Sequence, residues 1–247
     1  MSQPFPDHRQ AVRPGRLGAF QGPVQLQLHR RRRSPRVERL DRAAKRAMDV
    51  LLASAMLLAF SPLMLVIALL IRLTSPGPVL FRQVRVGYWQ SPFVMLKFRT
   101  MHVGIDDAIH RSYVTAMLTG QAAPVDAERG IYKLTRDPRV TSIGGFLRKT
   151  SLDELPQLIN VLRGEMSLVG PRPVLPWEAK LFEPWDRVRF AARPGITGLW
   201  QVTGRNALTM QQALYLDVEY ALRRTIVLDL VILFRTIPSV LLSRGAS

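Results

Sequence analysis

One long apolar segment limits how this chain can fold. Residues 50–71 form a run of apolar side chains that is interrupted only by Ser54, Ser61 and Pro62. As a helix rising about 1.5 Å per residue, the run would be about 33 Å long, close to the roughly 30 Å thickness of the hydrocarbon core of a bilayer. The sequence therefore predicts a membrane helix.

Proline and charge favour a helix that enters and leaves the bilayer on the same side. Pro62 removes a backbone hydrogen bond and clashes with the preceding turn, so we expect a kink at Ser61 and Pro62. Basic residues flank both ends of the run: Arg39, Arg42, Lys45 and Arg46 precede it, and Arg72, Arg82, Arg85, Lys97 and Arg99 follow it. The positive-inside rule places both flanks in the cytoplasm. We predict a re-entrant helix over residues 41–74, with a helix that crosses the bilayer once as the alternative.

The net charge of +17 is concentrated near the N-terminus, because residues 1–48 hold twelve basic and only three acidic side chains. Residues 1–40 lack a periodic apolar pattern and are predicted to form a disordered basic tail. A membrane-tethered nucleic-acid-binding protein could use this charge and the Arg30–Arg33 run, and it is the alternative function. Aromatic side chains are not interleaved with the basic residues of the tail, however, so we expect no nucleic-acid partner.

The composition also limits the metals and nucleophiles that the chain can use. It contains no cysteine, and its four histidines are widely spaced, at positions 8, 29, 102 and 110. Thiol catalysis, disulfides and Cys/His metal sites are therefore excluded. Any metal must be held by oxygen ligands.

Residues 75–247 are predicted to form a cytosolic catalytic domain, which together with the membrane helix gives an α+β fold. Its elements are a turn at residues 75–78, a β-hairpin over 79–86 and 93–98, a short helix and a loop over 102–128, and helices over 155–162, 210–222 and 226–234. Alternation of apolar and polar residues indicates the hairpin, and apolar spacing of three and four residues indicates the helix closed by Gly164. The segment 226–234 is too short to span a bilayer, so it is either a core helix or an interfacial one.

Two adjacent carboxylates open the helix over 155–162. Pro156 has no amide hydrogen and must lie in the first turn, which puts Asp153 at or beside the N-cap. Ser151 and Glu154 also fit a capping box, so a purely structural role stays open. The functional interpretation is that a helix N-terminus binds phosphate and keeps a carboxylate ionised, and such a carboxylate can attack phosphorus.

Cations surround this carboxylate pair in the sequence. Arg148 and Lys149 lie just before it, and Arg172 follows it in a rigid Gly/Pro segment. Each of these cations can bind phosphate oxygens, and arginine does so in a bidentate manner. A second rigid loop, residues 193–198, follows further along the chain.

Six motifs in order resemble the monotopic phosphoglycosyl transferase family of bacterial sugar transferases. They are KRAMDV before the Ser-Pro-kinked helix, KFRTM at residues 97–101, SLDELPQL, GPRP, RPGITGLWQVTGR and LDVEY. The resemblance extends from Lys45 to the C-terminus. The segments TRDPRVTSIGGFLRK and FRTIPSVLLSRGAS are most similar to members that begin exopolysaccharide repeat units with glucose- or galactose-1-phosphate.

The resemblance implies transfer of a sugar-1-phosphate from a UDP-sugar to undecaprenyl phosphate. It implies that Asp153 is a nucleophile that forms a covalent phosphosugar intermediate, and that Glu154 assists with magnesium or with proton handling. Mg²⁺ is the implied cofactor, with Asp153 and Glu154 as its ligands, since this ion usually bridges carboxylates to phosphate. The implied location is the bacterial inner membrane with the catalytic domain on the cytoplasmic face, and homo-oligomerisation is left open.

The resemblance also implies roles for residues around the dyad. The implied phosphate-binding residues are Arg148, Lys97, Arg99 and Arg172. The residues implied to shape the nucleotide-sugar site are Pro171, Pro173, Arg193, Pro194 and Gly195. Asp49 in the entry motif can pair with Arg46 at i+3 or with Lys45 at i+4 as the helix enters the lipid.

Overall fold

The computed structural model describes residues 35–102, 115, 139–204 and 208–241. Apart from residues 102 and 115, the short helix and loop expected over 102–128 lie outside these ranges. The elements are α1 (Pro35–Thr74), β1 (Leu80–Val86), η2 (Tyr88–Gln90), β2 (Pro92–Phe98), α3 (Ser142–Thr150), η4 (Leu152–Glu154), α4 (Gln157–Arg163), β3 (Ser167–Val169), α5 (Pro176–Lys180), η5 (Asp186–Ala191), β4 (Gly195–Thr197), α6 (Leu199–Thr203), α7 (Met210–Arg223) and α8 (Ile226–Leu241). The predicted mixture of helix and strand is confirmed.

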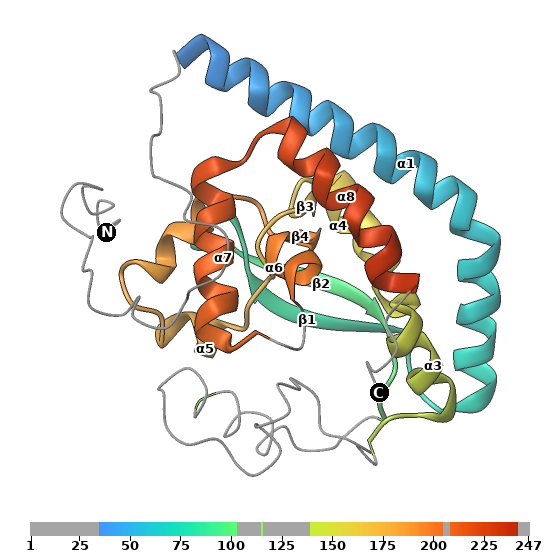
Figure 1. Ribbon diagram of the computed structural model, residues 1–247. Coiled ribbons are helices and arrows are strands. Elements are labelled where there is room, and N and C mark those ends of the chain that lie inside the picture. The colour runs from blue at the N-terminus through green and yellow to red at the C-terminus, as the bar shows by residue number, and fades with distance from the viewer. Residues whose placement is uncertain (1–34, 103–114, 116–138, 205–207, 242–247) are drawn as a thin grey trace.

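The apolar run lies within a single bent helix, α1, which begins at Pro35 and so includes residues 35–40 of the predicted tail. Figure 1 shows α1 changing direction along its length, so that its C-terminal part turns toward α3. Pro62 cannot donate to the carbonyl of Leu58, which an ordinary residue at this position would do. The Ser61 hydroxyl donates to that same carbonyl at 2.8 Å. Serine therefore satisfies the acceptor that proline leaves open.

One face of α1 packs on the rest of the chain, and the other is exposed. Ala53, Ile67 and Ile71 are buried, and Ile67 and Ile71 pack in a cluster with Phe98 and Leu147. The exposed large apolar residues of the helix are Leu40, Leu51, Leu52, Met56, Leu58, Phe60, Leu63, Leu65, Val66, Leu69, Leu70 and Leu73, and Leu58 is 78% exposed. A helix with so much exposed apolar surface is unusual for a protein surrounded only by water.

The predicted β-hairpin is confirmed. Strands β1 and β2 pair antiparallel, with Leu80 opposite Phe98 and Val86 opposite Pro92. The turn η2 contains two non-glycine residues with positive φ, Trp89 and Gln90. Strand β2 supplies Met95 to the main core and Phe98 to a second cluster, and Leu96 is also buried.

The main core lies between the membrane helix, the hairpin and the C-terminal helices. Its buried members are Ala53, Met95, Leu158, Val161, Met166, Leu168, Val169, Ala192, Tyr220, Ala221 and Ile232. The helix predicted over 210–222 is confirmed as α7, and the segment 226–234 lies in the longer helix α8. A second strand pair was not predicted: β3 and β4 run parallel, with Ser167 opposite Gly195 and Val169 opposite Thr197.

Candidate active site

The carboxylate pair lies in a single 3-10 turn between two helices. Thr141 caps the N-terminus of α3 by accepting a hydrogen bond from the Gly144 amide. Ser151 ends α3 in the left-handed conformation, with φ of 58°. The turn η4 follows immediately, and Asp153 within it is only 8% exposed.

The predicted capping arrangement is wrong in detail. The N-cap of α4 is Pro156, three residues after Asp153, and Ser151 makes no side-chain capping hydrogen bond to η4. The reason is that residues 152–156 already turn helically, so the chain enters α4 through a tight 3-10 turn. The C-terminal prediction is confirmed, because Gly164 ends α4 with φ of 80°.

Lys97 of strand β2 contacts both carboxylates. Its Nζ atom lies 2.7 Å from Oε1 of Glu154 and 3.9 Å from Oδ2 of Asp153. The structure thus joins three residues that were assigned to the site from separate motifs. A cation in this position offsets the mutual repulsion of two adjacent carboxylates and offers a charge to a bound phosphate.

The hairpin is fixed to α4 by one buried amide side chain. Asn160 accepts a hydrogen bond from the Leu96 amide at 3.0 Å and donates to the Val94 carbonyl at 2.7 Å. These bonds hold β2 at the two positions, 94 and 96, that lie just before Lys97. Since α4 also follows η4 in the chain, Asn160 fixes the lysine relative to the carboxylates.

The remaining predicted phosphate ligands differ in their surroundings. Within the described ranges, the side chains of Arg148 and Arg172 form no hydrogen bond or ion pair with the protein, and both are at least partly exposed. Arg99 is buried instead, and it donates to the carbonyls of Ser75 and Pro76 at 2.8 Å each and to the Ser75 hydroxyl. Arg99 therefore holds the turn that follows α1, a role that the sequence did not indicate.

The parallel pair β3 and β4 brings together the two rigid Gly/Pro loops, residues 170–173 and residues 193–198. The Gly195 amide donates to the Pro171 carbonyl, and the Gly170 amide donates to the Thr197 carbonyl, each at 2.9 Å. A Cβ atom on Gly170 or on Gly195 would overlap backbone atoms of the other loop. Only glycine permits this approach, which sets Pro171 near Pro194 in the lining of one small pocket. The Pro173 carbonyl accepts a hydrogen bond from Nη1 of Arg85 at 3.2 Å. Arg193 donates from Nε to the Gly164 carbonyl at 3.0 Å and stacks over the Tyr88 ring.

The entry motif of α1 docks on the catalytic elements. Of the two possible partners, Asp49 pairs with Lys45, at 3.0 Å, and also accepts a hydrogen bond from the Leu168 amide. Arg46 donates to the carbonyls of Val161 and Leu162 at 2.5 and 2.8 Å. It therefore satisfies acceptors at the C-terminus of α4, where a cation is favoured.

Lys45 also links α1 to α8. Its Nζ atom is 3.0 Å from Oδ2 of Asp229, whose other oxygen lies 2.7 Å from the Tyr220 hydroxyl. Burial raises the pKa of Asp229, and Lys45 opposes this rise. The membrane helix is thus tied to both helices that enclose the core.

A buried ion pair that contacts the first rigid loop, residues 170–173, was not predicted from the sequence. Arg189 of η5 pairs with Asp217 of α7, and the arginine also donates to the Arg172 carbonyl at 2.6 Å. Burial raises the pKa of Asp217 to about 6, although Arg189 lowers it. Asp217 belongs to the motif LDVEY, but the sequence indicates no ion pair for it, and no sequence signal marks Arg189 as buried.

The oxygen ligands at the dyad suit Mg²⁺ better than a transition metal. Among the described residues, no group of three or more His, Cys, Asp or Glu side chains could hold an ion by itself. Asp153 and Glu154 supply two carboxylates close to the Lys97 ammonium. Magnesium usually binds through one or two carboxylates, with substrate phosphates and water completing its shell.

An acidic dyad with a lysine, on a domain that packs along a largely exposed apolar helix, fits an enzyme that acts at a membrane. The sequence profile of the family described as bacterial sugar transferase matches residues 40–243. The chain therefore belongs to this family and is a phosphoglycosyl transferase.

Named relatives agree with this assignment. The chain is 44% identical over 203 residues to the exopolysaccharide production protein ExoY of Rhizobium meliloti, covering 82% of this chain and 88% of that protein. It is 42% identical to the UDP-glucose:undecaprenyl-phosphate glucose-1-phosphate transferase of Caulobacter vibrioides, covering 82% and 71%. It is 39% identical to the undecaprenyl-phosphate galactose phosphotransferase of Salmonella typhimurium, covering 85% of this chain and 43% of that longer protein.

Proposed function

We propose that this enzyme transfers a hexose-1-phosphate from a UDP-sugar to undecaprenyl phosphate and so begins synthesis of an exopolysaccharide. The observation that carries the proposal is the contact of Lys97 with Asp153 and Glu154 in a member of this family. The relatives named for glucose and galactose transfer support these two sugars as the first donors to test.

The reaction proceeds in two half-reactions. A carboxylate oxygen of Asp153 attacks the phosphorus that carries the sugar, and the bond from that phosphorus to the bridging oxygen breaks. UMP leaves with the electron pair of this bond. An oxygen of undecaprenyl phosphate then attacks the same phosphorus, which forms the lipid-linked diphosphate sugar and returns the carboxylate to Asp153.

The cations stabilise the charge of the phosphates. Lys97 neutralises the dyad, and the guanidinium groups of Arg148 and Arg172 bind phosphate oxygens. Asp153 and Glu154 would hold Mg²⁺, which when bound neutralises the diphosphate of the donor. Excess EDTA is expected to abolish transfer and added magnesium to restore it, and full activity in EDTA would contradict the metal assignment.

The packing of α1 supports a helix that does not cross the bilayer. Its buried contacts extend from Ala53 to Ile71, which is about 27 Å of helix at 1.5 Å per residue. A domain that packs along nearly the whole apolar run would lie inside the hydrocarbon if α1 spanned the bilayer alone. A re-entrant helix at the cytoplasmic face of the inner membrane leaves the domain in water.

Helix α8 also supports a position of the domain at the membrane surface. Its exposed apolar residues are Val227, Leu230, Val231, Phe234 and Ile237, whose spacing places them on one face, and Phe234 is 70% exposed. Of the two interpretations left open by the sequence, an interfacial helix fits this face better than a core helix. Ile232 and Asp229 on the other face are buried against the domain.

A burst of UMP tests the proposed chemistry. Enzyme in lipid nanodiscs, mixed with UDP-glucose or UDP-galactose and no lipid acceptor, should release about one equivalent of UMP per enzyme, as covalent catalysis requires. Asp153→Asn keeps the size of the side chain and should abolish the burst. Asp186→Asn makes the same change at a carboxylate of η5 and should retain it. Release of UMP only after undecaprenyl phosphate is added would show direct transfer and exclude the covalent step.

The alternative of a nucleic-acid-binding protein has a separate test. None of the three relatives described above is named for nucleic-acid binding. Deletion of residues 1–34 removes most of the basic tail before α1 begins. Sugar transfer should be unchanged by this deletion, whereas a nucleic-acid function would be lost.

A further inference from the structure

The loop Pro171-Arg172-Pro173 has very few hydrogen-bond donors of its own. Prolines carry no amide hydrogen, so the only backbone donor of these three residues is that of Arg172. The structure fixes the loop through its carbonyls instead. Pro171 accepts from the Gly195 amide at 2.9 Å, Arg172 from Nη2 of Arg189 at 2.6 Å, and Pro173 from Nη1 of Arg85 at 3.2 Å.

Arg189 is the most enclosed of these donors. It is 2% exposed and lies against two aromatic rings, with its guanidinium carbon 5.3 Å from the Phe182 centroid and 5.9 Å from the Phe190 centroid. Nη2 donates both to the Arg172 carbonyl and to Oδ2 of Asp217. The aromatic contacts and the ion pair leave the guanidinium little freedom to move.

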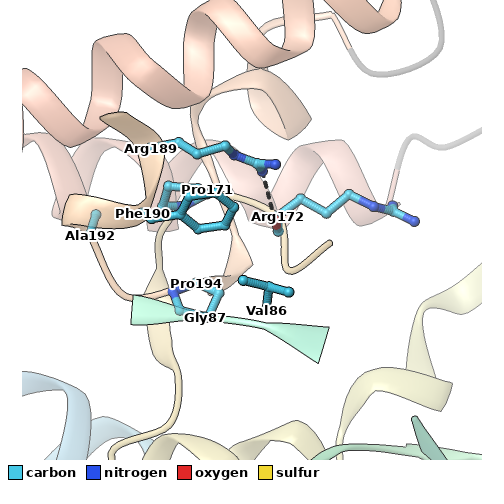
Figure 2. Close-up of a pocket in the computed structure, with 8 residues that line it drawn as sticks. All are labelled: Val86, Gly87, Pro171, Arg172, Arg189, Phe190, Ala192 and Pro194. Carbon is cyan, nitrogen blue, oxygen red and sulfur yellow. Dashed lines mark hydrogen bonds between the residues drawn. The ribbon is translucent and has the colours of Figure 1, made fainter. Parts of the chain in front are cut away.

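Figure 2 shows how this arrangement divides Arg172 into a fixed part and a free part. The Arg189 guanidinium points at the Arg172 carbonyl. The Arg172 side chain extends away from the other residues that line this small pocket. The backbone of Arg172 is therefore held, and its own guanidinium is available for a ligand. Asp217 is paired with Arg189 and feels the charge of Arg172 more weakly, so the Arg172 guanidinium can still bind a phosphate.

Stability alone is a weak explanation for this pair. Burying two charges is costly, and apolar residues of similar volume often replace a buried ion pair without loss of stability. A geometric effect is a better explanation, because a displacement of about 1 Å at a positioning group can reduce turnover by about two orders of magnitude. The pair acts on the loop at the one residue whose side chain can meet a diphosphate.

We propose that Arg189, held by Asp217, is a positioning residue that fixes Arg172 for binding of the donor diphosphate. This inference rests on the proposed function of the same site. It assigns a role to two buried side chains that lie outside the dyad and that touch no substrate themselves.

The test is a double-mutant cycle between the buried pair and Arg172. The first arm replaces the pair with apolar residues, Arg189→Met with Asp217→Leu, and the second arm is Arg172→Ala. In nanodiscs, KM for the UDP-sugar should rise about tenfold in the first arm, the loss expected for one hydrogen bond to a charged group, while kcat changes less than threefold. With Arg172 already replaced, the apolar pair should raise KM less than twofold, because its effect passes through Arg172.

Two further variants keep the result decisive. Arg224→Gln removes an arginine that donates to the carbonyl of Ala191, the last residue of η5, and it should leave KM unchanged. If the apolar pair fails to fold, Arg189→Lys retains the charge but lacks the planar group that lies against the Phe182 and Phe190 rings, and it enters the same cycle. Folded variants with unchanged KM, or effects that add fully to those of Arg172→Ala, would overturn the inference. Wild-type enzyme that releases no UMP from any UDP-sugar would instead refute the proposed function.

Discussion

Lys97 of β2 and Glu154 of η4 form a 2.7 Å ion pair between residues 57 positions apart in the chain. The pair depends on the hairpin being fixed to α4, because Asn160 bonds to the strand at Val94 and Leu96, just before the lysine. It is also the contact through which the hairpin reaches the carboxylate pair.

Removing this cation should slow the first half-reaction. Lys97→Met keeps the aliphatic stem but leaves the two carboxylates and the donor phosphates without the charge that offsets them. We expect UMP release in a single turnover to fall by about 10²- to 10³-fold, as for the loss of one preorganised electrostatic group. The matched control is Arg82→Gln on the exposed side of β1, which should keep full activity. An unchanged burst rate in Lys97→Met would assign the lysine to folding alone.

The contact between the two rigid loops predicts a strict need for glycine. Gly195→Ala places a Cβ atom against the Gly170 amide nitrogen and the Thr197 carbonyl, so the parallel strands must separate. We expect a large fall in melting temperature and loss of transfer. Gly145→Ala is the control, because its Cβ would approach no atom closer than 4.0 Å and alanine favours the helix by about 1 kcal/mol. Equal melting temperatures for the two variants would contradict this account of the loop contact.

Local patterns in the sequence were enough to predict the hairpin, the long helix α1, and α4, α7 and part of α8, but they did not predict α3, α5 or α6. Alternation of apolar and polar residues located β1 and β2, and Gly164 located the end of α4, because these features depend on neighbours in the chain. The parallel pairing of β3 with β4 depends on residues nearly thirty positions apart, and strands of three residues carry too little pattern to reveal it.

The site could also be predicted only in part, because its motifs are local but the contacts between them depend on the fold. The motifs named Asp153, Glu154 and Lys97, and the structure brings them together, but their catalytic roles stay proposals. Arg99 and Arg189 look alike in the sequence, since both are arginines near apolar residues. Only the fold shows that one holds the turn after α1 and that the other holds the Arg172 carbonyl.

The raised pKa of Asp217 gives a pH dependence with a defined sign. Burial raises this pKa from an ordinary value of 3.8 to about 6, so the folded state binds the proton more tightly than the unfolded state. The contribution of Asp217 to stability is therefore greatest below about pH 4, declines as the pH rises to about 6, and is constant above that. Asp217→Asn cannot titrate.

Melting temperatures of the two proteins, measured side by side from pH 4 to pH 7, check this sign. The difference between variant and wild type should move in favour of the variant between pH 4 and 6 and then level off. If the wild type instead gains relative stability over that interval, the ion pair with Arg189 outweighs burial and the pKa of Asp217 is lowered. Asp186→Asn serves as the control for a general effect of removing one carboxylate.

The position of α1 predicts that both of its flanks lie on one side of the membrane. Arg42 and Arg82 are exposed on either side of the apolar run, and neither forms a described contact with the catalytic residues. The chain has no native cysteine, so Arg42→Cys and Arg82→Cys can be labelled one at a time with a membrane-impermeant maleimide. Both should react in inverted inner-membrane vesicles, and neither should react in intact spheroplasts.

Pro62→Leu should weaken this placement. Leucine restores the amide that donates to the Leu58 carbonyl, so the Ser61 hydroxyl is no longer needed there and the helix can straighten. A straight apolar run is long enough to cross the bilayer, and part of the protein should then show one flank labelled from outside the spheroplasts. Leu65→Ile changes an exposed apolar side chain of the same run without altering the backbone, and its labelling should match that of the wild-type background. Labelling of residues 42 and 82 from opposite sides in the absence of Pro62→Leu would exclude the re-entrant helix and favour the single crossing.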